Sequence, residues 1–205
     1  SGWRPYAAEN LDHLGYGKCK NVVTNIDIEK MAKEGDFVRP SDGQPVKSVA
    51  FIQCAGSRDP DHLPYCSGVC CRVSLKQAKY IREKYPDSKV YILYKELRSP
   101  AQYELFYAQV QEDEGIFLTK GEVGEIREED DGQVTVAVDD TLLGENIEVT
   151  ADMVVLATGM VPTTQVDEEE APAEAAEGEG EAAADDAPAA DEGGEKKDEA
   201  ASAEK

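Results

Sequence analysis

The chain has 205 residues, 40% of them hydrophobic, and a formal net charge of −22 at pH 7. The excess of negative charge argues against nucleic acid or an anionic membrane surface as a direct partner, because both are polyanions. No apolar stretch approaches the roughly 20 residues that span a bilayer, so direct membrane insertion is not expected. We therefore expect a cytoplasmic protein, with any membrane association made through a partner.

Residues 1–24 show no sustained hydrophobic period and are interpreted as a surface connection. A short strand is expected near 22–23, followed by one short helix. Asn25 or Asp27 is predicted to cap this helix, which ends at Gly35.

The next segment, 46–53, is predicted to be a buried strand, because its apolar run is typical of a parallel sheet covered on both faces. Cys54 follows this strand, and a polar loop over 55–64 leads to a helix. In a dinucleotide-binding βαβ unit, this connection would be a glycine-rich turn that cradles a pyrophosphate. Cysteines occupy the place instead, and the chain has no GxGxxG fingerprint, so nicotinamide binding is not expected.

Four of the five cysteines form a candidate metal site with the spacing Cys-x11-Cys-x3-Cys-Cys: Cys54, Cys66, Cys70 and Cys71. Four thiolates from a strand end and a helix start supply the donor set of a [4Fe-4S] cluster or a structural zinc ion. The helix start favours negative charge, and Arg58 and Arg72 would add to that field. The spacing is neither a ferredoxin run nor a zinc ribbon, so both metals stay open.

A thiol-disulfide enzyme is a third interpretation of these cysteines. It would use Cys66 with Cys70, or the adjacent pair Cys70 and Cys71. The chain lacks the Cys-x2-Cys motif of the thioredoxin class, and no histidine neighbours the cysteines in sequence to act as a base. His13 and His62 are expected to be exposed rather than ligands, and Cys19 is left outside the site.

After the cysteines, helix and strand patterns alternate along the chain up to residue 163, beyond which the composition becomes acidic. Tyr103, Phe106, Tyr107 and Val110 form an apolar stripe that is expected to face the core. Residues 164–205 are acidic, contain no aromatic residue and are predicted to be disordered, because they cannot recover the entropy cost of folding. The expected helices are 70–84 and 101–114, and the expected strands are 89–94, 116–126, 133–138, 146–150 and 153–157.

Three runs of the sequence carry a resemblance to a known family: SVAFIQCAGSRD, YCSGVCCRVSLKQA and DTLLGENIEVTADMVVLATGMVP. They resemble the heterodisulfide reductase A-subunit family, including the A and B subunits of the quinone-interacting membrane-bound oxidoreductase complex. The resemblance covers residues 1–163. It implies an α/β fold, a Rossmann-like nucleotide-binding-type domain of a two-domain, thioredoxin-reductase-like flavoprotein reductase without the GxGxxG loop. The chain therefore looks like a piece of one of these proteins.

The resemblance also implies a division of the chain and a set of cofactors. Residues 1–45 would cross over from a FAD domain, and 46–163 would form the Rossmann-like domain. The four cysteines would ligate a [4Fe-4S] cluster, while Gly2, Thr158 and Gly159 would contact FAD, which this chain alone is not expected to retain. The implied function is electron transfer alongside other subunits of a redox complex, with no catalytic residue assigned here. The alternative is a non-catalytic zinc-binding or subunit-packing module.

Overall fold

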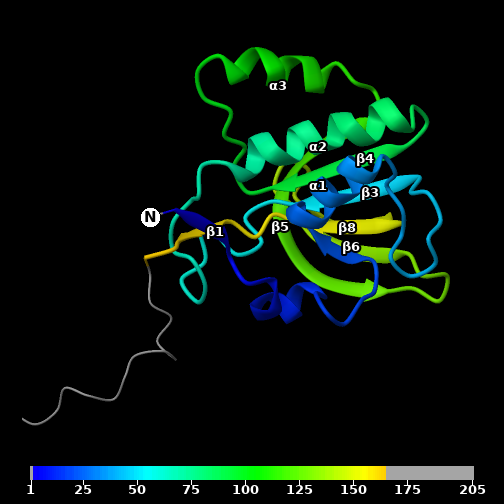
Figure 1. Cartoon of the computed structure of the whole chain (residues 1–205), viewed down its shortest axis with the longest axis horizontal. Helices are drawn as coiled ribbons and strands as arrows, with labels where there is room; N and C mark the ends of the chain where they lie inside the picture. Colours follow the sequence, from blue (N-terminus) through cyan, green and yellow to red (C-terminus); the bar gives the residue numbers. More distant parts are fainter. Residues whose placement is uncertain (1, 165–205) are drawn as a thin grey trace, which may run out of the picture. The chain divides into compact units, whose positions relative to one another are not determined.

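A seven-stranded sheet organises the protein, as seen in a computed structural model that describes residues 2–164 (Figure 1). The strand order is β2-β8-β3-β4-β5-β6-β7, and the first five strands pair in parallel. A separate two-stranded antiparallel ribbon joins β1 to β9. The strands are β1 (Trp3–Pro5), β2 (Val22–Thr24), β3 (Ser48–Ile52), β4 (Lys89–Tyr94), β5 (Ile116–Glu128), β6 (Val134–Asp140), β7 (Glu145–Ala151), β8 (Met153–Leu156) and β9 (Met160–Pro162).

Three helices and a 3-10 segment complete the fold: α1 (Asn25–Glu34), α2 (Cys70–Lys84), α3 (Tyr103–Gln111) and η1 (Ala8–Leu14). The unit β3-α2-β4 joins neighbouring parallel strands through a helix, which is the βαβ arrangement of a Rossmann-like fold. The predicted α/β class is therefore confirmed.

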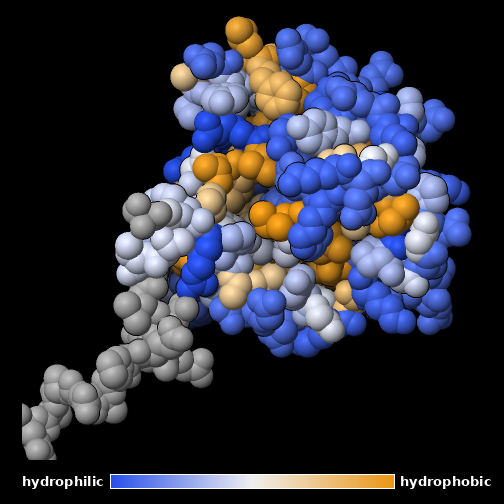
Figure 2. Space-filling view, viewed as in Figure 1, coloured by the Kyte–Doolittle hydropathy of each residue, from blue (hydrophilic) through white to orange (hydrophobic). Residues whose placement is uncertain are grey.

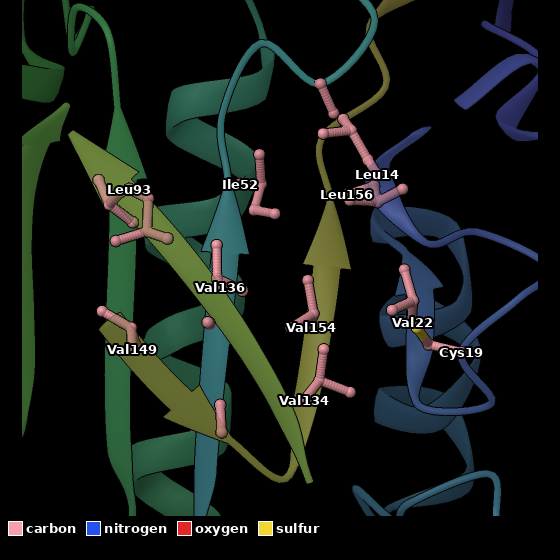
Figure 3. Packing of buried hydrophobic residues seen from close by; sticks show 14 of the residues in the cluster. Leu14, Cys19, Val22, Ile52, Leu93, Val134, Val136, Val149, Val154 and Leu156 are labelled. Atoms are coloured by element: carbon pink, nitrogen blue, oxygen red, sulfur yellow. The ribbon is translucent and has the colours of Figure 1, made fainter. Parts of the chain in front are cut away.

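Two apolar cores lie on opposite faces of the parallel sheet, because successive side chains of a strand point in opposite directions. Phe51 of β3 is fully buried on the helical face, with Ile28 of α1 and Leu75 of α2. Ile52 faces the other way and packs with Val136 of β6, which passes across β3 in Figure 3. The long strand β5 makes this second layer, since it leaves the parallel sheet and pairs antiparallel with β6. Strands β5, β6 and β7 form this antiparallel meander, and the candidate site lies at the carboxyl ends of β3 and β4.

Helix α2 follows directly from its sequence pattern. Its buried residues include Leu75, Ala78 and Ile81, which recur on one face, and its C-cap is Tyr85, just before a proline. The predicted range of 70–84 is confirmed, as is the neighbouring strand at 89–94. In both elements, most of the residues that are buried in the folded protein are apolar.

The first helix is capped by a residue other than those predicted. Thr24 is the N-cap of α1, and it forms a capping box with Asp27: the Thr24 hydroxyl accepts from the Asp27 amide, and the Asp27 carboxylate accepts from the Thr24 amide at 3.0 Å. The prediction of Asn25 as the cap is wrong, because its side-chain amide instead donates to Gln77 of α2. That contact ties α1 to α2.

Replacing Thr24 with alanine is expected to lower the free energy of unfolding by about 1 kcal/mol, the usual cost of losing an N-cap. The amide of Asp27, in the first turn of α1, loses its side-chain acceptor. Urea denaturation followed by circular dichroism measures this change. An unaltered midpoint would show that the capping box does not contribute to stability.

The third helix is shorter than predicted, running over Tyr103–Gln111 rather than 101–114. Val110 is buried and Phe106 and Tyr107 are half-buried, as the apolar stripe predicts, but Tyr103 is 42% exposed. Its ring lies under the guanidinium of Arg72, 4.7 Å from the ring centroid. The visible surface is largely hydrophilic, and apolar side chains also gather near α2 and α3 (Figure 2).

The beginning of the chain is more structured than the sequence indicates. The sequence predicts a surface connection with one short strand over residues 1–24, but β1 and η1 also lie there, and Leu11 and Leu14 of η1 enter the second core. Strand β2 lies at the edge of the main sheet beside β8. The predicted acidic tail, 164–205, lies outside the described residues except for Thr164.

Candidate metal centre

The four predicted ligands lie between the end of β3 and the first turn of α2. Cys54 follows β3 with a left-handed φ of +57°, a conformation that side chains other than glycine rarely adopt. On either side of it the chain stays in register with the sheet, because the Gln53 amide donates to Leu93 O and the Ala55 amide to Ala157 O. Cys70 and Cys71 are the first two residues of α2. Helix α2 begins after Cys66, so this thiol belongs to the loop rather than to a helical face.

The structure brings these four thiols into one region: Cys54, Cys66, Cys70 and Cys71. In each of the six pairings among them, the charge of one thiolate raises the pKa of the other. Cys70 is central, because it is the thiol whose pKa responds to all three others. Cysteines separated by a loop of more than ten residues therefore lie near enough for their charges to interact.

Burial dominates the protonation of these thiols. It raises the pKa of Cys70 to about 12, with the other three thiols adding to the shift. Burial also raises the pKa of Cys54, and nearby Cys71 adds to it, while Arg58 opposes the change. In the absence of a metal, desolvation outweighs the helix start and favours neutral thiols.

Two further cations near the thiols, Lys95 and Arg98, are not predicted from the sequence. They lie in the segment after β4, where Lys95 lowers the pKa of Cys54 and Arg98 lowers that of Cys71 against the raising effect of burial. The Cys71 thiol donates to the carbonyl of Glu96, 3.8 Å away. The Glu96 carboxylate pairs with both Arg58 (3.1 Å) and Arg98 (2.9 Å). A signal existed in the sequence, since the carboxyl ends of neighbouring parallel strands meet at one edge of a sheet.

The two arginines named from the sequence behave differently. Arg58 has a left-handed φ of +61° and acts on Cys54, as expected. Arg72 donates to the carbonyl of Gly68 at 2.8 Å and covers Tyr103, so its guanidinium is engaged away from the thiols. Among residues 2–164, no side chain caps the start of α2. The backbone amides of the first turn of α2 therefore point out of the end of the helix at which Cys70 and Cys71 lie.

The loop over residues 55–69, here called the cysteine loop, packs against the turn between β8 and β9. A Cβ atom at Gly159 would lie 2.2 Å from the hydroxyl of Ser57 and 2.8 Å from that of Ser67. Gly159 also has a φ of +89°, so its lack of a side chain serves both the turn and this close approach. Thr158 and Gly159 are buried in this turn, whereas Gly2 is exposed and accepts from the Thr163 amide on the β1-β9 ribbon. Their predicted contact with FAD stays a prediction.

The donor set fits an iron-sulfur cluster or zinc by chemistry, since it offers four cysteine sulfurs in one region with cations near them. The arrangement is not a closed coordination shell, however. Within residues 2–164, no group of three or more cysteine, histidine or acidic side chains is placed closely enough to hold a metal ion. Loading would therefore have to draw the sulfurs together while the thiols lose their protons, a coupling common at metal sites.

The remaining candidates lie elsewhere. Cys19 is buried in the second core, and the charged groups that act on it are Glu128 and Lys18 rather than other thiols. His13 is exposed, as predicted, but His62 is half-buried. The two imidazoles stack with centroids 5.2 Å apart, and His62 Nδ1 lies 2.9 Å from the Tyr6 hydroxyl.

Comparison with known proteins places these observations in context. No family model matches the chain. It is 43% identical over 164 residues to an iron-sulfur A-subunit of the CoB–CoM heterodisulfide reductase of Methanopyrus kandleri, covering 76% of this chain and 25% of that protein. It is 41% identical over 169 residues to the A-subunit of the H(2):CoB-CoM heterodisulfide,ferredoxin reductase of Methanothermobacter thermautotrophicus, covering 79% and 26%. The chain thus spans about a quarter of the length of these relatives.

Among solved structures, the chain is similar in fold to the reduced form of ornithine hydroxylase from Pseudomonas aeruginosa. The TM-score is 0.50 at 15% sequence identity, and the match covers 80% of this chain and 45% of that one. This likeness concerns the fold alone, and it agrees with the Rossmann-like topology described above.

Proposed function

We propose that this chain, which belongs to the heterodisulfide reductase A-subunit family and matches about a quarter of its relatives' length, is an electron-transfer part of a flavin and iron-sulfur oxidoreductase. One observation supports the proposal: four thiols lie within electrostatic reach of one another in the connection from β3 to α2, where a dinucleotide-binding unit has its glycine-rich turn. A site built from sulfur donors suits single electrons, whereas hydride transfer needs a bound nucleotide.

Four residues would hold a [4Fe-4S] cluster: Cys54, Cys66, Cys70 and Cys71. When bound, such a cluster accepts and releases one electron at a time. The protein supplies the conditions for this chemistry. Cys71 is buried and Cys54 and Cys70 are half-buried, which limits their contact with water, and Arg58 and Arg98 place positive charge near the sulfurs. Thiols whose pKa is raised by burial must release protons when they become ligands, so loading is expected to be favoured at higher pH.

Flavin would belong to the longer protein rather than to this chain. Gly2, Thr158 and Gly159 are proposed to approach FAD, and they lie along the β1-β9 ribbon and its adjoining turn. The chain offers no GxGxxG loop for the pyrophosphate. We therefore expect the purified chain to carry much less than one flavin per molecule, and a stoichiometric flavin absorption spectrum would contradict this.

Other subunits of a redox complex are the proposed partners, because a one-electron carrier needs a donor and an acceptor. Any membrane association would pass through them. Within the part of the chain that the structure describes, no helix is both long and apolar enough to cross a bilayer.

Metal analysis of oxygen-free protein tests the proposal directly. We expect brown protein that contains about four iron and four sulfide ions per chain and bleaches with dithionite, as a [4Fe-4S] cluster does. Colourless protein with one zinc ion per chain would overturn the electron-transfer role. It would instead favour a structural zinc or subunit-packing module, which the same four thiols also suit.

A further inference from the structure

Both sequence neighbours of Cys66 bind the same residue, Met160. The Tyr65 hydroxyl donates to the Met160 carbonyl at 3.1 Å, and the Ser67 hydroxyl accepts from the Met160 amide at 2.9 Å. Met160 opens β9 and pairs with Pro5 of β1. The loop on either side of Cys66 is thus held to the β1-β9 ribbon by two hydrogen bonds of opposite direction.

A second set of contacts closes this clamp. The hydroxyls of Ser57 and Ser67 lie 3.2 Å apart, and both fill the space beside Gly159. The Tyr65 carbonyl accepts from the Arg58 amide at 3.1 Å, which ties the two ends of the cysteine loop together. Tyr65 and Ser67 therefore cannot move away from β9 without breaking several contacts at once.

The other three thiols are placed by regular secondary structure. Cys54 lies between backbone hydrogen bonds that continue the sheet, and Cys70 and Cys71 belong to α2. Cys66 lies in a loop, half-buried, and depends on its neighbours' side chains for its position. The side chains of Tyr65 and Ser67 make their hydrogen bonds to the β1-β9 ribbon.

We propose that Tyr65 and Ser67 are positioning residues that hold Cys66 against β9, so that the β1-β9 ribbon sets the place of this thiol relative to the other three. The metal-related part of this inference rests on the proposed function. The placement of the thiol does not, because it is a property of the iron-free chain. Displacement of the ribbon would move Cys66 first among the four.

The first test uses iron-free protein and iodoacetamide, with labelling of each cysteine followed by mass spectrometry. Ser67→Ala is expected to accelerate labelling of Cys66 about five- to tenfold, the factor that loss of one net hydrogen bond produces in a local opening equilibrium. Tyr65→Phe should act in the same direction, and Ser67→Thr, which keeps a hydroxyl, should restore slow labelling. Labelling of Cys54 should not change.

Ser48→Ala is the matched control. The Ser48 hydroxyl accepts from the Asp152 amide at 3.0 Å, the same type of hydrogen bond at the opposite end of β8. This variant should lose no more stability than Ser67→Ala, because the Asp152 amide also donates to the Ser48 carbonyl at 3.1 Å, and it should leave the labelling of Cys66 unchanged. Equal acceleration in both serine variants, or none in Ser67→Ala, would overturn the clamp.

The second test uses anaerobically prepared protein and measures iron release to a chelator. Ser67→Ala should release iron faster than Ser48→Ala by a factor similar to that seen in labelling. Equal release rates would show that the clamp does not position a ligand. If the unaltered chain binds no iron, the electron-transfer proposal fails, while the labelling experiment still decides whether Tyr65 and Ser67 hold Cys66.

Discussion

Replacing Cys70 with alanine is expected to reduce bound iron from about four ions per chain to the background level of the assay. Cys70 is the thiol that interacts with all three others, and it opens α2. A [4Fe-4S] cluster needs four ligands, and no spare thiol lies beside the group, since the fifth cysteine is in the second core. Iron and sulfide analysis of anaerobic protein measures the loss, and Cys66→Ala should give the same result.

Cys19→Ala is the control for this prediction. Cys19 is more deeply buried than Cys70, so the substitution disturbs packing at least as much, but its charged neighbours are Glu128 and Lys18. It should cost about 1 kcal/mol of stability through the lost sulfur and leave the iron content unchanged. Full iron loading of Cys70→Ala would refute the ligand assignment, as would iron loss in Cys19→Ala.

Gly56→Ala is expected to cause the largest loss of stability among the variants considered, about 1–3 kcal/mol in the free energy of unfolding. Its new Cβ would lie 2.6 Å from the Thr158 carbonyl oxygen and 2.6 Å from the Tyr6 ring. The carbonyl belongs to the backbone of the β8-β9 turn, so it cannot rotate away as a side chain does. The cysteine loop would have to move off this turn, and Cys66 would move with it.

Gly124→Ala separates this steric effect from the general effect of removing a glycine. Gly124 lies in β5, and the nearest neighbour of its added Cβ, the Ala137 carbonyl oxygen, is 3.8 Å away, an ordinary contact. Alanine there should be neutral or stabilising by up to about 1 kcal/mol, because the unfolded chain loses freedom. Urea denaturation of both variants measures the difference. A loss in Gly56→Ala no greater than in Gly124→Ala would show that the loop and turn are not in tight contact.

The elements with a strong local pattern are those that the sequence predicts most closely. The helix over 70–84 and the strand over 89–94 have the predicted limits, because their apolar residues repeat with the period of the element that forms. The strands of the meander also agree with the prediction, although β5 extends to Glu128 and bends through a register shift. By contrast, the sequence does not predict η1, since its burial depends on contact with the distant meander.

For the site, residue types and spacing were enough to select the four cysteines. Their proximity follows from the chain order, because all four lie between the end of β3 and the first turn of α2. The cations beside them were less apparent. Lys95 and Arg98 follow a different strand, and only the pairing of β4 with β3 brings that strand end to the thiols.

The amino-acid sequence alone determined which cysteines are candidate metal ligands, most of the segments that become helix or strand, and that a glycine-rich nucleotide turn is lacking. These properties are local, because they depend on residue type and on periods of a few residues. The tertiary structure decided how Cys66 is held, since Tyr65 and Ser67 reach Met160 across 95 and 93 positions of the chain. A hydrophobic period of a few residues cannot predict a contact between residues so far apart in sequence. The contact forms only when β9 folds beside the loop.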